Sequence, residues 1–577
     1  MREKMKGSVF SKAKNCRILA ALLCMVWLIA AAPLQSFAAD KSQATERANL
    51  VLFAYFADEA DTDWFNKESD GAHTDANTKG MTNVQRFIQY YDGSQNRSFS
   101  SYMSKISGGT YKVKNIFPQY DESTGKVTPV RLSVTEADAK AKDCDAQVIE
   151  DLEKEINLSA WADKLDLNND GVIDNVSVVL QSSKDGTTAG TTLRSHKFTT
   201  YAISSWNGTS LAPYTFNMLN TTSLNNKRAG LIAHEYLHSL NYPDLYRKTD
   251  SDYPVGNWDM MSADGRFMVY PLAYLRMAIS GWATVPDITV AASKTTNNAD
   301  KTITYDLTLK TISDTNLDNA VMITSPKNPY EKFVIEVREK PEDYLNGDSL
   351  DGGIPKSGVI IYRVDTTVEN FGNFSGQTGV YVFGPGSGKT REDAALDAAN
   401  PTYGNADLNA NLDKTEAITY SDGSNTGIVV SEVGDIQDGK VSLKVTVPDW
   451  SSLDAWEDNA GDISGNYSVT LVDLDGQAMA IAQQSQWNNT VNFYKYSSGQ
   501  WSASDLPALT DNNYVTDVKL ISFGGKTFVS YVSVDEYSSY GHVKVLENNT
   551  WKEITDSSSQ NIGKVDNNQL DMGVAGG

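Results

Sequence analysis

Two histidines and a glutamate within five residues form the most reactive pattern in this chain. The segment reads His234-Glu235-Tyr236-Leu237-His238. Histidines four apart lie on one face of an α-helix, one turn apart, so both imidazoles can reach a single zinc ion. Glu235 projects about 100° further round the helix, where it can hold a metal-bound water and take its proton. The pentapeptide therefore indicates hydrolysis by a zinc-activated water, although the same spacing also occurs by chance on ordinary helices.

The residues after His238 can supply the third protein ligand that a catalytic zinc needs. Asn241 suits the left-handed position at which a helix reverses, and Pro243 prevents the helix from continuing. Such a turn can bring the Asp244 carboxylate back to the metal, so Asp244 is our predicted third ligand. Asp244 could instead hydrogen-bond a ligand histidine without touching the metal, and the rival ligands are Asp250, Asp252 and Asp259.

Apolar residues at helical spacing around the pentapeptide predict a largely buried helix, with Ser223 as its N-cap. The segment His234–Tyr246 resembles the HExxHxxGxPDxY signature of the immune inhibitor A family of secreted bacterial metallopeptidases, with Asn241 in place of the glycine. Met261 matches the methionine turn that runs beneath the metal in related metzincin peptidases. The likeness extends over about residues 48–448. It implies a zincin-type α+β catalytic domain that hydrolyses peptide bonds.

An aspartate-rich loop offers a second metal site. Side-chain oxygens stand at loop positions 1, 3, 5 and 9, a glycine at position 6, and a backbone carbonyl at position 7, as in the front of a calcium loop. In order, these residues are Asp166, Asn168, Asp170, Asp174, Gly171 and Val172. Ser177 at position 12 replaces the bidentate glutamate of an EF-hand, so the loop is not an EF-hand. We predict Ca²⁺ here; the alternative is a calcium-free Asx turn.

The N-terminus indicates export. Basic residues precede an apolar run from Ile18 to Ala32, and Ser36-Phe37-Ala38 offers a small-x-small cleavage site. We therefore predict a signal peptide over residues 1–38, a secreted bacterial protein, and no stable membrane anchor after cleavage. A transmembrane anchor is the alternative, but the apolar run is short.

Charge and cysteine content narrow the possible partners. Removing residues 1–38 takes away six basic residues and one acidic residue, leaving 44 Lys and Arg against 72 Asp and Glu, a net charge of −28. Such a balance argues against nucleic acid or an anionic membrane as partner. Cys144 is then the single cysteine, so no intramolecular disulfide can form.

Sequence texture predicts three domains after the signal peptide. Residues 39–285 mix strands with helices and form the predicted catalytic domain, and residues 286–449 alternate as short strands of a β-sandwich. Residues 450–577 form a β repeat region in which Trp501 recurs as Trp551, and Asp511-Asn-Asn513 recurs as Asp566-Asn-Asn568. A period of about 50 residues predicts propeller-like blades, although two and a fraction blades cannot close a ring.

Two functions remain open on the sequence. The first is a secreted zinc-dependent endopeptidase that hydrolyses extracellular proteins or peptides, with Glu235 as general base. The alternative is a catalytically inactive adhesion or binding protein that uses its β domains, and the repeats could bind a cell-surface or matrix ligand. One of three tyrosines could stabilise the oxyanion, namely Tyr246, Tyr253 or Tyr270. We interpret His73 and His196 as structural or surface residues.

Overall fold

The structure is a computed structural model, and it divides the chain into two compact units, Met1–Pro448 and Asp449–Gly577. It describes residues 45–70, 78–93, 97–138, 145–182, 194–247, 253–290, 293–313, 316–343, 349–373, 377–384, 393–404, 417–450, 468–474, 477–483, 489–497, 500–523, 525–534, 538–554 and 563–564. Several predictions fall outside these residues: the signal peptide 1–38, Cys144, His73, Asp250, Asp252 and the repeated segment 566–568.

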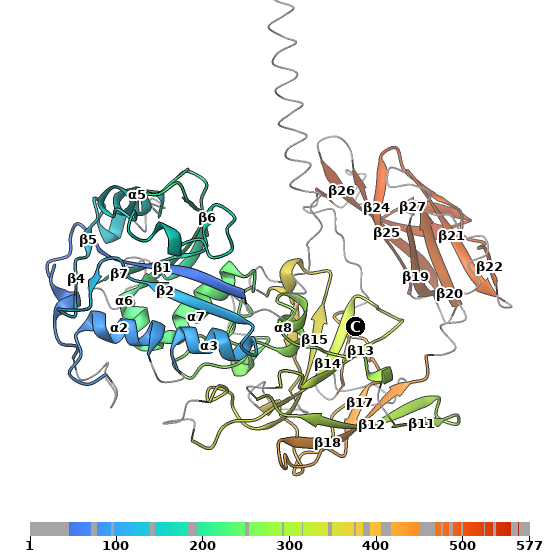
Figure 1. Cartoon of the computed structure of the whole chain (residues 1–577). Coiled ribbons are helices and arrows are strands. Elements are labelled where there is room, and N and C mark those ends of the chain that lie inside the picture. Colours follow the sequence, from blue (N-terminus) through green and yellow to red (C-terminus); the bar gives the residue numbers. More distant parts are fainter. Residues whose placement is uncertain are drawn as a thin grey trace, which may run out of the picture. The chain divides into compact units, whose positions relative to one another are not determined.

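A mixed β-sheet forms the centre of the predicted catalytic domain (Figure 1). In spatial order its strands are β2 (Tyr111–Ile116), β1 (Thr45–Tyr55), β7 (Val176–Gln181), β10 (Thr215–Asn220) and β8 (His196–Thr199), and β5 (Val130–Arg131) also pairs with β1. The strands β2, β1, β7 and β10 run parallel to one another, whereas β8 is antiparallel to β10 and ends that path through the sheet.

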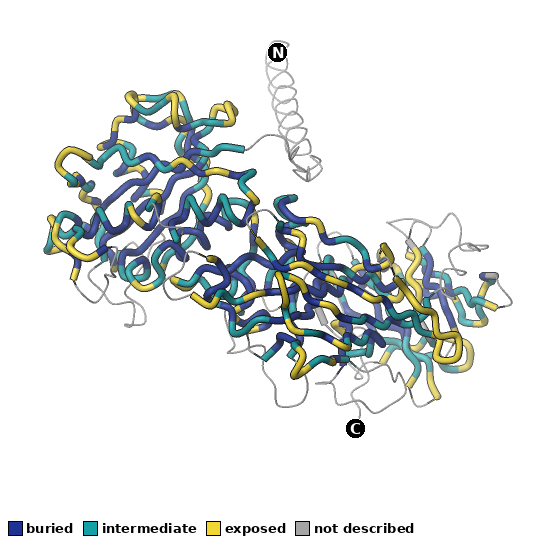
Figure 2. Tube along the Cα trace, turned by 60° about the horizontal axis from the view of Figure 1, so that its bottom comes forward, coloured by how far each residue is buried: buried dark blue, intermediate teal, exposed yellow. Residues whose placement is uncertain are grey.

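Helices cover both faces of this sheet. On one face lie α2 (Asn83–Asp92), α3 (Phe99–Ile106), α6 (Thr221–Lys227) and α7 (Ala229–Ser239), and α5 (Asp145–Glu155) lies on the other (Figure 1). Successive residues of β1 enter the two cores in turn: Val51 and Phe53 pack with α3 and α7, while Leu50 and Leu52 pack with α5. Because both faces are covered, the centre of β1 and the whole of β7 are buried (Figure 2).

Two four-stranded antiparallel sheets follow within the first unit. One contains β11 (Ser293–Asn297), β12 (Thr302–Lys310), β18 (Lys440–Pro448) and β17 (Val429–Ser431). The other contains β13 (Ala320–Thr324), β14 (Glu331–Arg338), β15 (Gly358–Asp365) and β16 (Val380–Val382). Nearly every residue of β14 and β15 is buried, which shows that the second sheet is covered on both faces.

The second sheet shares a core with the predicted catalytic domain. Val334 of β14 and Tyr362 of β15 belong to the same buried cluster as Tyr236 of α7 and Met261. The predicted boundary between residues 285 and 286 therefore lies inside one compact unit. The division into a catalytic domain and a separate β-sandwich stays a prediction.

The second unit consists of two antiparallel sheets whose strands follow chain order. The first contains β19 (Ser468–Leu474), β20 (Gln477–Gln483), β21 (Thr490–Ser497) and β22 (Gln500–Ala503), and β23 (Leu509–Thr510) pairs with β21. The second contains β24 (Tyr514–Phe523), β25 (Lys526–Val534), β26 (Ser539–Glu547) and β27 (Thr550–Glu553), and β28 (Gly563–Lys564) pairs with β26. The repeat thus forms two similar sheets; their assembly into a propeller stays a prediction.

The coarse fold class, an α+β region followed by β-rich regions, is confirmed. The predicted helix cap at Ser223 is wrong. Asn220 caps α6, and Arg228 at φ 57° separates α6 from α7, because the chain turns sharply between them. Among the described residues, no helix combines the length and the apolar character needed to cross a membrane.

Candidate metal centre

The pentapeptide lies on α7, whose position is set by close contact and by one buried amide. A Cβ on Gly230 would lie 2.1 Å from the carbonyl oxygen of Gly265, so glycine is required where the helix begins. The side chain of Asn217 on β10 donates to the carbonyl of Glu235 at 2.8 Å, which ties the helix to the sheet. His234 and Glu235 are both buried within α7.

Three ligand atoms converge beside this helix. Nε2 of His234 and Nε2 of His238 each lie 3.2 Å from Oδ1 of Asp244, and the three ligand atoms lie within 4.8 Å of one another. Asn241 has φ 68°, and this left-handed residue reverses the chain so that Asp244 returns toward the helix. Among the described residues, this is the one group of three or more metal-ligating side chains.

The geometry of the cluster fits a tetrahedral metal. Ligand bonds of about 2.0–2.2 Å place neighbouring ligand atoms about 3.3–3.5 Å apart in a tetrahedron, close to the observed spacing. Oδ1 of Asp244 is buried, and among the described residues it has no hydrogen-bond partner. A buried carboxylate oxygen without a donor is costly unless a cation satisfies it. The three side chains therefore suit a divalent metal with N and O ligands.

Both imidazole ligands are oriented by a hydrogen bond at the ring nitrogen that faces away from the cluster. Nδ1 of His234 lies 3.2 Å from the carbonyl oxygen of Met260, and Nδ1 of His238 lies 2.8 Å from the carbonyl oxygen of Tyr242. These bonds leave both Nε2 atoms free to bind a metal. The carbonyl of Met261 accepts from the backbone N–H of Leu245 at 3.0 Å, so the methionine turn also supports the loop carrying Asp244.

The charged side chains of the cluster change one another's pKa values. Burial raises the pKa of the Glu235 carboxyl above its usual range, and the positive charge of the two nearby histidines works against that rise. Burial also raises the pKa of Asp244, but its contacts with His234 and His238 outweigh burial and hold that pKa well below its usual range. Asp244 therefore stays ionised, as a metal ligand must.

Asp259, the rival ligand within the described residues, has a different role. It is fully buried, Oδ1 accepts from the N–H of Met261 at 2.7 Å, and Oδ2 accepts from the N–H of Leu272 at 2.6 Å. Burial raises its pKa to about 6. Its carboxylate thus holds the methionine turn.

The remaining candidate residues, three tyrosines and His196, lie in different surroundings. The ring of Tyr246 lies 6.4 Å from that of His234, whereas Tyr253 is half exposed and Tyr270 is buried against Arg276. Tyr246 also interacts with the carboxylates of Asp244 and Glu235, which places it beside the cluster. Both ring nitrogens of His196 are hydrogen-bonded, Nε2 to Asp145 and Nδ1 to the carbonyl of Arg194, each at 2.8 Å.

Residues 36–268 match the family model for the immune inhibitor A peptidase M6 catalytic domain. Over this region the chain is similar to the immune inhibitor A-like family. The match includes the pentapeptide, Asp244 and Met261, and it supports a metallopeptidase function. No curated protein sequence matches the chain.

A buried charged network supports the methionine turn from beyond the immune inhibitor A match. Nη1 of Arg338 on β14 donates to the carbonyl of Trp258 at 2.8 Å, and Nε donates to Asp351 at 2.8 Å. Asp351 accepts from the N–H of Tyr270 at 2.9 Å. Arg338 is fully buried, and the nearby carboxylates, with Asp351 first among them, keep its pKa above the usual range despite burial.

Two further residues, Glu336 on β14 and Asn373 in the loop before β16, hold the surroundings of the site. Glu336 accepts from the N–H of Ala273 and from the hydroxyl of Tyr362, each at 2.9 Å, and so fixes the start of α8 (Ala273–Ala278). Asn373 donates from its backbone to the carbonyl of Asp244 and from its side chain to the carbonyl of Leu245, each at 2.9 Å.

Sequence reasoning missed these supporting residues. One signal was present for two of them: Glu336 and Arg338 are charged residues on one face of a strand that is otherwise apolar at its centre. Charges in a buried strand usually have partners, which could have flagged the network. Asn373 carried no comparable signal.

The aspartate-rich loop shows backbone turns. The two carboxylate oxygens of Asp166 accept from the N–H groups of Asp170 and Gly171, at 3.0 and 2.8 Å. Asp170 accepts from the N–H of Val172 and from the amide of Asn168. Asp174 accepts from the N–H of Ala48 and Leu167. Among the described residues, the carboxylates of this loop do not form a cluster of three close enough to share one ion, and Ca²⁺ stays a prediction.

We expect Asp244→Ala to lose zinc and Asp259→Ala to keep it. Removing a ligand should empty the site in dialysed protein, whereas loss of Asp259 frees two backbone N–H groups and lowers stability. Metal analysis and thermal melting of both variants check this. Full zinc occupancy in Asp244→Ala beside an empty Asp259→Ala would reverse the assignment.

We expect Arg338→Lys to weaken zinc binding about 10–100-fold, the cost typical of residues that orient metal ligands. Lysine cannot hold Asp351 and the carbonyl of Trp258 together as the guanidinium does. The matched control is Arg363→Lys. Arg363 lies on neighbouring β15 and pairs with Glu331 without contacting the methionine turn. Equal zinc affinity in the two variants would show that Arg338 has no special role.

Calcium binding predicts that EGTA at fixed zinc lowers the melting temperature, because a ligand that binds the folded state stabilises it. Asp170→Ala should abolish the response. Identical melting curves with and without calcium would identify the loop as an Asx turn alone.

Proposed function

We propose that this protein is a secreted zinc endopeptidase that hydrolyses peptide bonds in extracellular proteins. The observation that carries the proposal is the convergence of His234, His238 and Asp244 beside Glu235, within a region of the immune inhibitor A-like family. Two imidazoles and a carboxylate leave a fourth position open, as catalytic zinc sites do.

Glu235 is the general base in this proposal. A bound zinc would supply Lewis-acid activation of the attacking water and of the scissile carbonyl. Glu235 takes the proton of the water and then passes it to the leaving amine. Burial favours this exchange because it raises the pKa of the carboxyl toward neutrality. The phenol of Tyr246, whose ring lies 6.4 Å from that of His234, could donate to the oxyanion.

The sheet offers a way to bind a peptide. In the spatial order of the sheet, β8 follows β10 and ends the path, and α7 packs near β8. An extended substrate can pair with such an edge through backbone hydrogen bonds. Pairing along an edge does not require a free chain end, which favours an endopeptidase over an exopeptidase.

The alternative is an inactive exported adhesion or binding protein. Such a protein would need the fold, but it would not need the three ligands to be aligned. The three ligands, the base and the bonds that orient both imidazoles are all retained, so the peptidase is the better supported function.

We expect Glu235→Ala to keep zinc and fold while losing about 10²–10⁴-fold in activity, the usual contribution of a general base. Hydrolysis of casein, zinc content and the melting temperature should be measured on the same preparations. Because Glu235 is not among the three clustered ligands, zinc content serves as the internal control. A variant with near wild-type turnover would disprove the proposed mechanism.

A further inference from the structure

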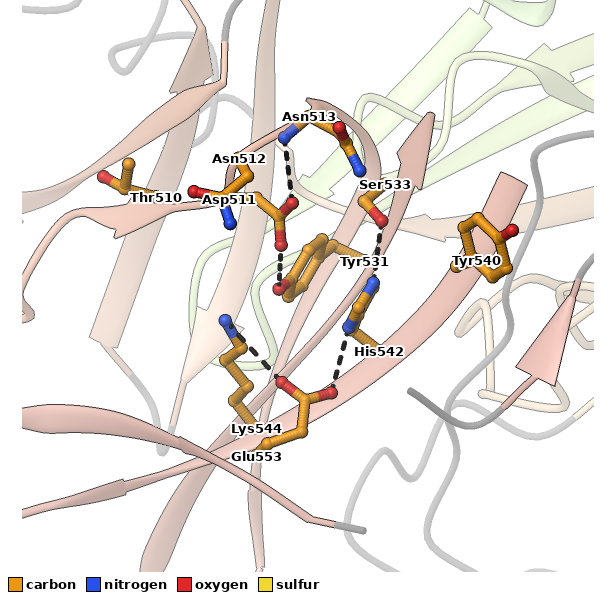
Figure 3. Close-up of a pocket in the computed structure, with 10 residues that line it drawn as sticks. All are labelled: Thr510, Asp511, Asn512, Asn513, Tyr531, Ser533, Tyr540, His542, Lys544 and Glu553. Atoms are coloured by element: carbon orange, nitrogen blue, oxygen red, sulfur yellow. Dashed lines mark hydrogen bonds and ion pairs between the residues drawn. The ribbon is translucent and has the colours of Figure 1, made fainter. Parts of the chain in front are cut away.

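A cavity of about 530 Å³ opens in the second compact unit, where the chain passes from β23 to β24 (Figure 3). This volume lies within the usual range for small-ligand sites, about 300–1,000 Å³. All the residues that line it have polar or ionisable side chains. Such a lining is poorly suited to an apolar ligand and well suited to one that hydrogen-bonds throughout.

A hydrogen-bonded chain across three strands forms one side of the cavity. Oγ of Ser533 on β25 lies 2.7 Å from Nε2 of His542 on β26, and Nδ1 of His542 lies 3.0 Å from Oε1 of Glu553 on β27 (Figure 3). An ionised carboxylate only accepts, so Nδ1 donates to Glu553 and a neutral ring accepts the Ser533 hydroxyl at Nε2. These bonds hold the side chains rigid.

The remaining charged groups also have partners inside the protein. Asp511 accepts from the hydroxyl of Tyr531 at 2.8 Å and from the backbone N–H of Asn513 at 3.0 Å. Nζ of Lys544 lies 3.6 Å from Glu553 and 5.0 Å from the centre of the Tyr531 ring. An ionic ligand would meet charges of both signs here, so this cavity favours a neutral ligand.

Other side chains around the cavity are free to bind. Among the described residues, the amides of Asn512 and Asn513 and the hydroxyl of Tyr540 make no side-chain hydrogen bond, and all three line the cavity. The turn at Asp511 uses its carboxylate and the backbone of Asn513, so it does not need either amide. An amide both donates and accepts, which matches a sugar hydroxyl.

We propose that this cavity binds a neutral saccharide. Neighbouring hydroxyls of the sugar would pair with the amides of Asn512 and Asn513, and the ring of Tyr540 could contact its C–H face. Ser533, His542 and Glu553 already hold one another in place, so the side chains on this side of the cavity lose little conformational entropy when the saccharide binds. The site is independent of the proposed peptidase activity.

The alignment of Ser533, His542 and Glu553 also resembles that of a nucleophilic triad. A nucleophile needs exposure and donors for the oxyanion. Ser533 is only 2% exposed, and its backbone lies in the β25–β26 ladder opposite Tyr540. We therefore assign these three residues a supporting role.

Saturation-transfer NMR on the full chain tests the proposal, with Glu235→Ala present to prevent self-digestion. The probes are the methyl glycosides of glucose, galactose, mannose and N-acetylglucosamine at millimolar concentration. At least one should bind. Asn512→Ala combined with Asn513→Ala should weaken it about tenfold, since each neutral hydrogen bond contributes about 2- to 12-fold.

The matched control is Asn492→Ala on β21, outside the cavity, which should bind as the parent does. Tyr540→Phe offers a second, milder test because it removes one hydroxyl. Melting curves confirm that each variant is folded. Absence of signal from all four glycosides, or binding unchanged in the double variant and in Tyr540→Phe, would overturn the proposal. Labelling of Ser533 by a fluorophosphonate would overturn it in favour of a nucleophilic site.

Discussion

The metal centre depends on holding a buried carboxylate oxygen about 3 Å from two imidazole nitrogens. With both imidazoles neutral, such an arrangement is unfavourable, because the oxygen has left water and faces two ring nitrogens that carry no proton to donate. The protein therefore fixes each ligand through its other side. Backbone carbonyls of Met260 and Tyr242 orient the histidines, and the left-handed residue Asn241 delivers Asp244. These constraints leave a site in which a divalent cation would satisfy the remaining oxygen.

The same requirement explains the charged residues beneath the site. Arg338, Asp351 and Glu336 are buried together, and removing charges from water costs several kcal/mol for each ion unless the geometry is excellent. Here the cost is offset by bonds to backbone groups of Trp258, Tyr270 and Ala273, which few apolar side chains could replace. Burying these charges costs some folding free energy, and the resulting hydrogen bonds fix the backbone path of the methionine turn. A catalytic region matched over residues 36–268 thus relies on strands that come later in the chain.

In the second unit, the buried polar side chains are arranged differently. In the cavity beside β25 and β26, ionisable side chains are paired with one another, while the side-chain amides of Asn512 and Asn513 have no hydrogen-bond partner among the residues that the structure describes. Paired charges stiffen one part of the surface, and free amides leave hydrogen-bonding capacity for a ligand. Both units therefore place unsatisfied polar atoms beside residues that are held by hydrogen bonds to other parts of the protein.

The sequence by itself determined the candidate metal-binding pentapeptide, the α+β and β-rich textures, and the turn after His238. Helical spacing alone puts His234 and His238 on one face, and Asn241 tolerates the positive φ that returns Asp244. These are local properties, so sequence reasoning reaches them. It failed at Ser223, because the break at Arg228 follows from packing around the start of α7. Only the tertiary structure showed that Asp259 holds a turn, that Arg338 and Asn373 support the ligands, and that Asp511–Asn513 border a cavity. Those roles depend on contacts between residues far apart in the chain, and no local pattern encodes them.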